Sequence, residues 1–312
     1  MTDDPDYGWN PPDGLMTHAD MPIAADMDFF ISPPEEVGEV LSAFSTLSRK
    51  KEPMGATTRL IIGMVVAFVC WLGLWLIISM SNPLDGGMGH VVGGIVGLIG
   101  FAITYAFTGF KHTCTFVGKK GIARYTIKGS READPTEELL EFDQATDLFT
   151  GQTRHYTNGV YSGTHYNFRW DGGDGRKLLN LNGTFHSEAG NPKPTDPFHF
   201  AQSGEIAWSI YLLDQLQSEL EKHESVEFKV NRSDAVRVGI GFMEFCFGGK
   251  EQRVEGEDLK HISIAGGTFS FKTADAGGWF SSKGKFSFSY ANMANARCFL
   301  LVLNNLLGVS FD

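Results

Sequence analysis

Two long apolar runs near the N-terminus constrain this chain more than any other feature. Residues 60–80 read LIIGMVVAFVCWLGLWLIISM, residues 91–110 read VVGGIVGLIGFAITYAFTGF, and neither run holds an acidic or basic residue. At about 1.5 Å of rise per residue, each helix would cover roughly 30 Å, the hydrocarbon thickness of a bilayer. A pair of buried core helices is the alternative, but core helices rarely stay free of charge over this length. The runs predict two transmembrane helices, and the polar residues 1–59 argue against a cleavable signal peptide.

The charges around the runs predict an orientation. The connection SNPLDGGMGH (81–90) has room only for a turn and contains no Lys or Arg. Basic residues flank the hairpin on its two outer sides: Arg49, Lys50, Lys51 and Arg59 before it, and Lys111, Lys119, Lys120 and Arg124 after it. Because positive charge marks the cytoplasmic side, we expect a multi-pass protein of the cell inner membrane with both termini cytoplasmic.

Small residues indicate how the two helices pack. Gly93 and Gly97 form a GxxxG pair, Gly100 extends it, and Gly63 with Ala67 offers a matching notch on the first helix. Small side chains let helix backbones approach closely in lipid. We expect these residues to pack within the hairpin, with a homodimer face as the alternative. The charge-free spans argue against a proton relay or an ion path.

The segment before the hairpin, residues 1–58, is acidic and rich in proline. The first 59 residues carry 11 acidic and 4 basic side chains, and so hold most of the formal net charge of −11. Such a segment buries little apolar surface, so we expect a mostly disordered cytoplasmic tail. Its apolar cluster Phe29, Phe30 and Ile31 is a candidate docking motif for a partner or for this protein's own domain; incidental hydrophobes in a solvated tail are the alternative.

From residue 111 onward, apolar residues alternate with polar ones, as in β-strands. THYNFRW places Tyr166, Phe168 and Trp170 on one face of a strand, between turn signals at Asn158-Gly159 and DGGDG (171–175). Residues 203–223 change to helical spacing, with Ser203 as the expected N-cap. The expected buried helical face is Ile206, Ile210, Leu213, Leu216 and Leu220.

Strands followed by a helix then occur a second time, ending in the helical stretch ANARCFLLVLNNLL. FVGKKGIARY (116–125) matches FCFGGKEQRV (245–254), and EELLEFDQATDLF (137–149) matches EDLKHISIAGG (257–267). In each pair, a strand, a Gly-Lys turn and another strand lead into an acidic, leucine-containing segment. The matches indicate an internal repeat over residues 111–223 and 224–312.

A β-meander that ends in one helix resembles pleckstrin-homology-like (PH-like) domains. GKKGIARY (118–125), with GGTFSFKT (266–273) and FSFSYANMANARCFLLVLNNLLG (286–308), resembles an uncharacterised family of bacterial membrane proteins that carry PH-like domains on a short transmembrane hairpin. The resemblance implies a membrane protein with a two-helix hairpin (59–110) and an α+β cytoplasmic region of two tandem PH-like domains, 111–223 and 224–312. The family supplies no catalytic residues.

Candidate catalytic, cofactor and metal sites are not found in the sequence. The histidines form no HxxxH or HxH pair, the four cysteines follow no CxxC pattern, and DGGDG lacks the trailing glutamate of a calcium loop. The glycines of GGIVGLIG lack the preceding strand and the Lys-Ser/Thr of a phosphate loop. No basic stretch resembles a nucleic-acid-binding surface. We therefore expect no catalytic residues, no cofactor and no metal.

Lys119, Lys120 and Arg124 are the candidate lipid contacts. PH-like domains that bind phosphoinositides carry bases near the first hairpin, and the KKGIAR stretch resembles that placement. The leading functional hypothesis is a non-enzymatic, membrane-anchored interaction or scaffold protein with a protein partner, such as an accessory subunit of an inner-membrane assembly. The alternative is a protein that binds or senses lipid headgroups at the cytoplasmic leaflet, and an enzyme acting at the membrane is the third class.

Overall fold

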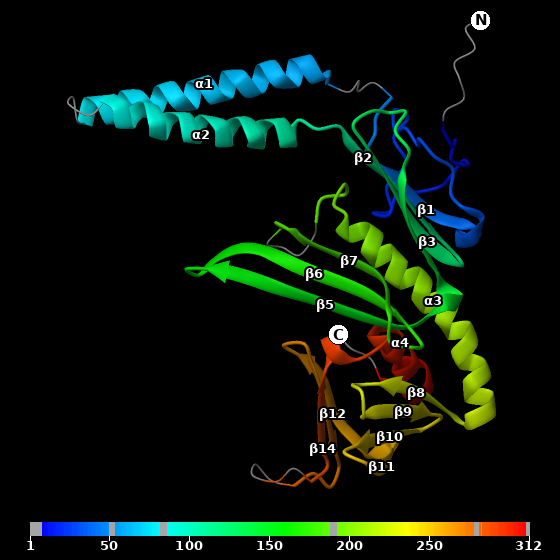
Figure 1. Cartoon of the computed structure of the whole chain (residues 1–312). Helices are drawn as coiled ribbons and strands as arrows, with labels where there is room; N and C mark the ends of the chain where they lie inside the picture. The colour runs from blue at the N-terminus through cyan, green and yellow to red at the C-terminus, as the bar shows by residue number, and fades with distance from the viewer. Residues whose placement is uncertain are drawn as a thin grey trace, which may run out of the picture.

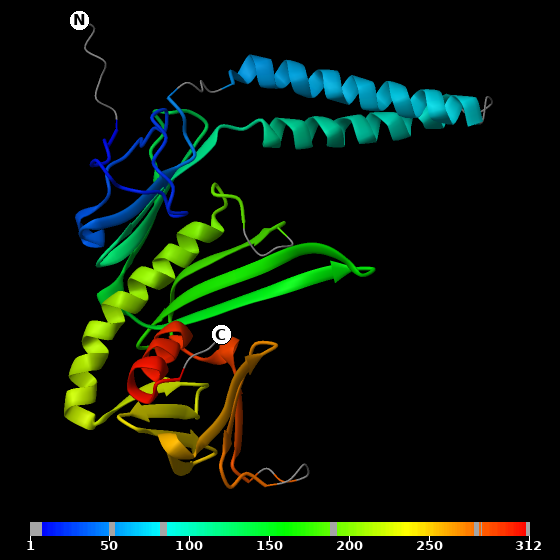
Figure 2. The same cartoon turned by 180° about the vertical axis from the view of Figure 1, so that it is seen from behind.

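The computed structural model describes residues 8–49, 54–81, 86–187, 192–277, 281 and 283–309, and Figures 1 and 2 show it from opposite sides. The helices are α1 (Ala56–Ser81), α2 (Gly86–Phe107), α3 (Phe198–His223) and α4 (Ala296–Leu307). The strands before α3 are β1 (Val40–Ser45), β2 (Lys111–Gly118), β3 (Gly121–Lys128), β4 (Thr136–Glu141), β5 (Ala145–Thr157), β6 (Val160–Gly172) and β7 (Lys177–Phe185). Those after α3 are β8 (Ser225–Lys229), β9 (Ala235–Gly239), β10 (Phe242–Phe247), β11 (Lys250–Glu255), β12 (Leu259–Ala265), β13 (Thr268–Thr273) and β14 (Lys285–Ser289).

Helices α1 and α2 form a hairpin that projects away from the β-rich remainder of the chain (Figures 1 and 2). Both are long and apolar enough to cross a membrane, over Thr57–Met80 and Gly87–Phe107. The helices differ in their bounds from the predicted 60–80 and 91–110, so Arg59 and His90 lie inside them. Of the predicted turn 81–90, residues 82–85 lie outside the described residues, and the other six belong to the ends of α1 and α2.

The hairpin is inserted into the first β-sheet. Strand β1 precedes it and pairs antiparallel with β2, which follows it, with Ala43 opposite Phe116 and Ser45 opposite Cys114. The sheet has the order β1-β2-β3-β4. The first domain therefore begins before the hairpin, and the predicted boundary at residue 111 separates one strand from its sheet.

The segment before β1 covers one face of this sheet. Phe29 and Val37 of this segment, with Ala43 of β1, are buried against Phe116 and other residues of β2 and β3. The prediction of a mostly disordered tail is wrong for residues 8–49, because its few hydrophobic side chains find a prepared apolar surface on the sheet. Residues 1–7 and 50–53 lie outside the described residues.

The second sheet, β5-β6-β7, faces the first sheet across a core that helix α3 closes. Tyr166, Phe168 and Trp170 all point into this core, as their alternation predicts. The expected face of the helix was wrong at Ile206 and Ile210, which are 37% and 57% exposed.

Helix α3 also begins five residues earlier than expected. Its buried side chains include Phe200, Ala201 and Trp208, and its first residue is Phe198. Ser203 lies within the first turns rather than at the N-cap, and its hydroxyl donates to the backbone oxygen of His18 (3.0 Å). This contact ties α3 to the N-terminal segment, which the local sequence pattern does not reveal.

The second half of the chain repeats this plan with sheets β8-β9-β10-β11 and β12-β13-β14 followed by α4. We call β1–β7 with α3 the first unit, and β8–β14 with α4 the second unit. A matching backbone hydrogen bond occurs in both: Phe142 N donates to Lys120 O, and Gly256 N donates to Gly241 O, each at 2.7 Å. In each unit this bond ties the short 3-10 turn before the second sheet to the turn between the second and third strands.

This equivalence corrects the register of the predicted repeat. In the structure, β3 and β4 of the first unit are equivalent to β10 and β11 of the second unit. The sequence match instead aligned 116–125, the end of β2 and the start of β3, with 245–254, which spans β10 and β11. The match is therefore displaced by one strand, because β1 lies on the other side of the hairpin and was not counted. One continuous core joins the two units, from Val117 through Trp208 in α3 to Phe299 in α4.

Candidate functional site

The junction between the hairpin and the first sheet is packed. Strand β2 begins at Lys111, four residues after α2 ends at Phe107. Phe110 is buried between Leu47 and Ile127, and its backbone oxygen accepts a hydrogen bond from Gly129 N (2.9 Å). The hairpin therefore meets the sheet through a small apolar cluster on its C-terminal side.

The predicted packing residues lie between α1 and α2. A Cβ atom placed on Gly93 would lie 2.8 Å from the backbone oxygen of Trp71, and one on Gly97 would lie 2.8 Å from that of Ala67. Gly63 faces the ring of Phe101, and Gly100 lies against Cys70 and Val66. These glycines allow the two backbones to approach within one hairpin.

Lys119 and Lys120 lie at the opposite end of β2 from the hairpin. Seven residues of extended strand separate Lys111 from Gly118, which is about 23 Å. The Nζ of Lys119 forms an ion pair with Glu39 (2.6 Å), and the Nε of Arg124 forms one with Glu138 (2.5 Å). Lys119 and Lys120 therefore lie away from the hairpin, because β2 runs away from it, and Arg124 lies midway along β3.

The bases at the hairpin-proximal end are different ones. Lys111 and Lys128 are directly opposite each other in the β2–β3 pair. Sequence reasoning used Lys111 only for topology and missed Lys128. The sequence does contain a signal for this pair. GKKG is a tight-turn sequence, and matching residues outward from that turn along β2 and β3 places Lys111 opposite Lys128.

The candidate docking residues are docked on this protein's own sheet. Phe29 is 1% exposed, and its ring meets Trp9 edge-on at 5.2 Å and lies tilted against Phe116 at 6.0 Å. Phe30 and Ile31 pack at the edge of the same cluster. In this structure Phe29, Phe30 and Ile31 therefore pack within the first unit.

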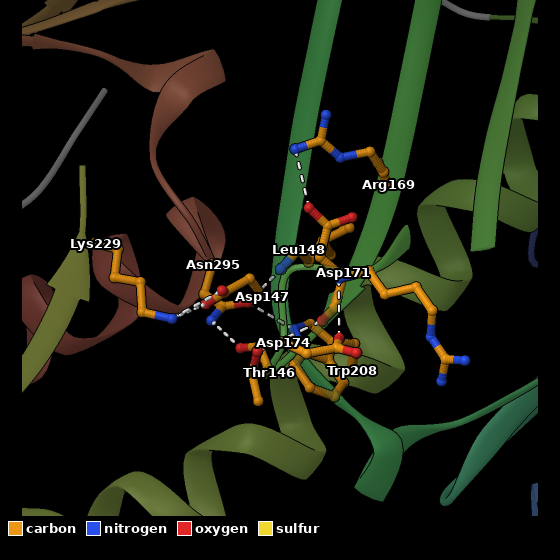
Figure 3. A network of polar contacts seen from close by, with 10 residues as sticks. Thr146, Asp147, Leu148, Arg169, Asp171, Asp174, Trp208, Lys229 and Asn295 are labelled. Carbon is orange, nitrogen blue, oxygen red and sulfur yellow. Dashed lines mark hydrogen bonds and ion pairs between the residues drawn. The ribbon is translucent and has the colours of Figure 1, made fainter. Parts of the chain in front are cut away.

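A polar joint connects the two units, and Figure 3 shows it from close by. The side-chain oxygen of Asn295 accepts hydrogen bonds from Leu148 N (2.9 Å) and Trp208 Nε1 (2.8 Å), and its amide nitrogen donates to Thr146 O (2.9 Å). Asn295 itself has a φ of 56°, a left-handed conformation that asparagine tolerates better than most residues. Lys229 adds an ion pair to Asp147 (2.9 Å). The joint fixes the start of α4 to β5 and α3 of the first unit.

Beside this joint lies a cleft of about 1,200 Å³, lined by residues of both units. Arg169 and Asp171 form an ion pair there (3.0 Å), and the residue Asp171 is 8% exposed. The Nε of Arg169 and the Oδ1 of Asp171 are buried with no hydrogen-bond partner among the described residues. The ion pair itself, between Arg169 Nη2 and Asp171 Oδ2, is the polar contact of these two residues on the cleft wall.

The histidines, the cysteines and the DGGDG segment all lie in the described part of the chain. No group of three His, Cys, Asp or Glu side chains is placed there to hold a metal ion. The DGGDG segment ends β6 and forms the turn into β7, with Gly175 at a φ of 74°. Its Asp174 carboxylate accepts the backbone N–H of Arg176 (2.9 Å), which is the hydrogen bond of a turn.

A scan against protein-family models finds no match to this chain, and a search of curated proteins finds no similar sequence. The arrangement of the hairpin, the two units and the cleft is the remaining indication of function.

Proposed function

We propose that this chain is a non-enzymatic scaffold of the inner membrane, with two PH-like domains that present a partner-binding cleft at the cytoplasmic face. The observation that carries the proposal is the insertion of the hairpin between β1 and β2. A domain joined to both ends of a membrane hairpin is held at the bilayer surface by two covalent connections. Such a domain cannot move away from the membrane, as befits an accessory subunit of a larger assembly.

The orientation follows from charge. Both ends of the hairpin enter the same sheet, so both must lie on one side of the membrane. Arg49, Arg59 and Lys111 flank these ends, and positive charge favours the cytoplasmic side.

A labelling experiment tests this orientation. In a variant with the native cysteines replaced, Met88→Cys should react with an impermeant thiol reagent added to intact cells, and Ser130→Cys should not. Labelling at position 130 would place the two units outside the cytoplasm and contradict the proposal.

The cleft between the units is the proposed partner surface. It combines residues of both units and carries charges of both signs, among them Asp174, Lys177 and Arg232. A partner segment that carries charges of both signs would pair with the charged side chains along the walls.

Photo-crosslinking in cells tests the partner surface. A crosslinking amino acid at Lys177 or Ser233, both exposed in the cleft, should give discrete adducts to a partner. The matched control is Lys272, which is exposed on β13 away from the cleft. Equal labelling at all three positions, or no adducts from the cleft, would contradict the proposed surface.

A further inference from the structure

The first unit contains a second cavity, of about 220 Å³, at its hairpin-proximal end. It lies between the strands β1–β3 of one sheet and β6–β7 of the other, with the start of α3 as its third wall. Lys111, the first residue of β2, lines it, and so does Thr113. The cavity is separate from the interdomain cleft and shares no residue with it.

Tyr166 supplies a polar group that the protein does not satisfy. The residue is 4% exposed and lines the cavity, yet its hydroxyl has no hydrogen-bond partner among the described residues. The phenol lies over Gly183, where a Cβ atom would come within 2.5 Å of the hydroxyl oxygen. Burial raises the pKa of Tyr166 to about 12, so the hydroxyl keeps its proton and remains a donor at neutral pH.

Two cations also line this cavity. Arg124 uses its Nε for Glu138, which leaves its terminal nitrogens as donors. Lys111 has no ion-pair partner among the residues that the structure describes. The carboxylate of Asp196 on the cavity wall is engaged at the start of α3, where it accepts the N–H of Phe198 (2.9 Å).

His18 completes the wall as a neutral, fixed side chain. Its ring nitrogens contact Ser42 Oγ (2.7 Å) and Thr115 Oγ1 (2.9 Å). Burial lowers the pKa of His18 to about 3. Tyr166, Arg124 and Lys111 therefore supply the phenol, guanidinium and ammonium donors of the wall, and Asp196 supplies its carboxylate.

From this arrangement we propose that the cavity binds the phosphate group of an anionic phosphate ester, supplied by the headgroup of a membrane lipid. A phosphate oxygen can accept from a phenol, a guanidinium and an ammonium together. The apolar walls formed by Phe44, Leu181 and Phe200 suit the carbon skeleton of the ester. The four residues from Phe107 to Lys111 span at most about 14 Å, so the cavity lies within headgroup reach of the end of α2.

Binding to the purified full-length chain in detergent tests the proposal, with native mass spectrometry as the readout. The probes are dihexanoyl phosphatidylglycerol, dihexanoyl phosphatidylcholine and glycerol 3-phosphate. We expect phosphatidylglycerol to bind and Tyr166→Phe to weaken it about tenfold, as for loss of a hydrogen bond to a charged group. Lys111→Gln, at an exposed position, should weaken it several-fold without affecting folding.

The double variant Lys119→Gln and Lys120→Gln is the matched control, because it removes two bases outside the cavity and should bind like the wild type. Equal binding of glycerol 3-phosphate, with the same dependence on Tyr166 and Lys111, would support the phosphate site and assign it to a free ester instead of a lipid. Binding unchanged in both cavity variants, loss of binding in the control, or no binding of any probe would overturn the proposal.

Discussion

The two units share one plan and differ in the connection between their first two strands. In the second unit, β8 and β9 are joined by a tight turn in which Asn231 Oδ1 accepts the N–H groups of Ser233 (2.8 Å) and Asp234 (2.9 Å). In the first unit, the same connection contains the whole hairpin of α1 and α2. Strand pairing is the same in both, so the sheet is specified by its own side chains and does not depend on a short turn.

The difference has a simple physical reason. The entropic cost of closing a loop grows only slowly with its length, so a long insertion at an exposed connection is tolerated. An insertion that forms its own helices costs less still, because its ends are brought together by helix packing. The first unit also gains the covering segment 8–37, for which the second unit has no counterpart in the described chain.

Removing the first strand should break the first unit and have the largest effect. A fragment of residues 111–312 lacks β1 and the covering segment, which leaves Cys114 and Phe116 without their apolar partners. We expect it to aggregate on size-exclusion chromatography. A chain that joins residues 8–49 to residues 109–312 through a short glycine-serine linker should be a soluble monomer with a β-rich circular dichroism spectrum. A well-folded 111–312 fragment would contradict the assignment of β1 to this sheet.

The closing helix of the second unit should be the next most sensitive region. Leu303 is fully buried in α4, whereas Asn304 is exposed. Truncating a buried leucine costs about 2–5 kcal/mol, so Leu303→Ala should lower the stability of the linked soluble chain by that amount in urea unfolding. Asn304→Ala should be close to neutral. Unchanged stability in Leu303→Ala would mean that α4 does not close the second core.

The joint between the units can be weakened without touching either core. Asn295→Gly keeps the left-handed backbone available but removes the side chain that bonds Thr146, Leu148 and Trp208. Loss of these bonds should cost about 2–3 kcal/mol, because buried backbone and indole groups lose their partners. We also expect one calorimetric transition in the parent chain and two in the variant. Asn292→Ala, on the cleft wall nearby, is the control and should retain one transition.

The smallest expected effect concerns pH and the covering segment of the first unit. Because burial lowers the pKa of His18 from 6.5 to about 3, the unfolded state binds a proton there below pH 6.5 that the folded state does not. Stability should fall as pH decreases below 6.5, by about 1.4 kcal/mol per pH unit from this residue. His18→Gln should lose this dependence, as measured by urea unfolding between pH 7 and 5.5, over which His18 contributes about 1.4 kcal/mol.

The contribution of a second buried group, Glu205, to stability depends on pH in the opposite direction. The wild type must therefore be compared with His18→Gln. Burial raises the pKa of Glu205 from 4.5 to about 6, so its contribution favours the folded state at the lower end of that range. Wild type and His18→Gln both contain Glu205, so the difference between their pH profiles isolates His18. Parallel profiles would show that His18 is accessible to protons in the folded protein.

Several elements follow from local sequence. The charge-free runs predict two helices long enough to cross a membrane, and the alternation in THYNFRW predicts the buried row of Tyr166, Phe168 and Trp170. The glycines of the GxxxG pair indicate a close helix contact, which the structure places between Gly97 and Ala67. Each of these features depends on residues that are neighbours in sequence or on one repeating period.

The candidate sites followed less well from the sequence. The KKGIAR bases lie within six residues of sequence, but the direction of β2 puts Lys119 and Lys120 at the far end of the sheet from the hairpin. Ile206 and Ile210 fit a helical period, yet the core contacts a neighbouring face of α3 that carries Ala201 and Trp208. Periodicity indicates that a helix has an apolar face, but the packing partner decides which side chains it buries.

The sequence by itself determined the hairpin, most strands, the closing helices and the existence of a repeat, because these depend on hydrophobic periods and turn residues over short distances. Only the tertiary structure decided that β1 belongs to the first sheet, since its partner Phe116 lies beyond the whole hairpin in the chain. The same holds for the joint at Asn295 and the cavity around Tyr166, which are made by residues more than a hundred positions apart or on opposing sheets. Such contacts are fixed by how sheets and helices pack against one another, and no local pattern encodes them.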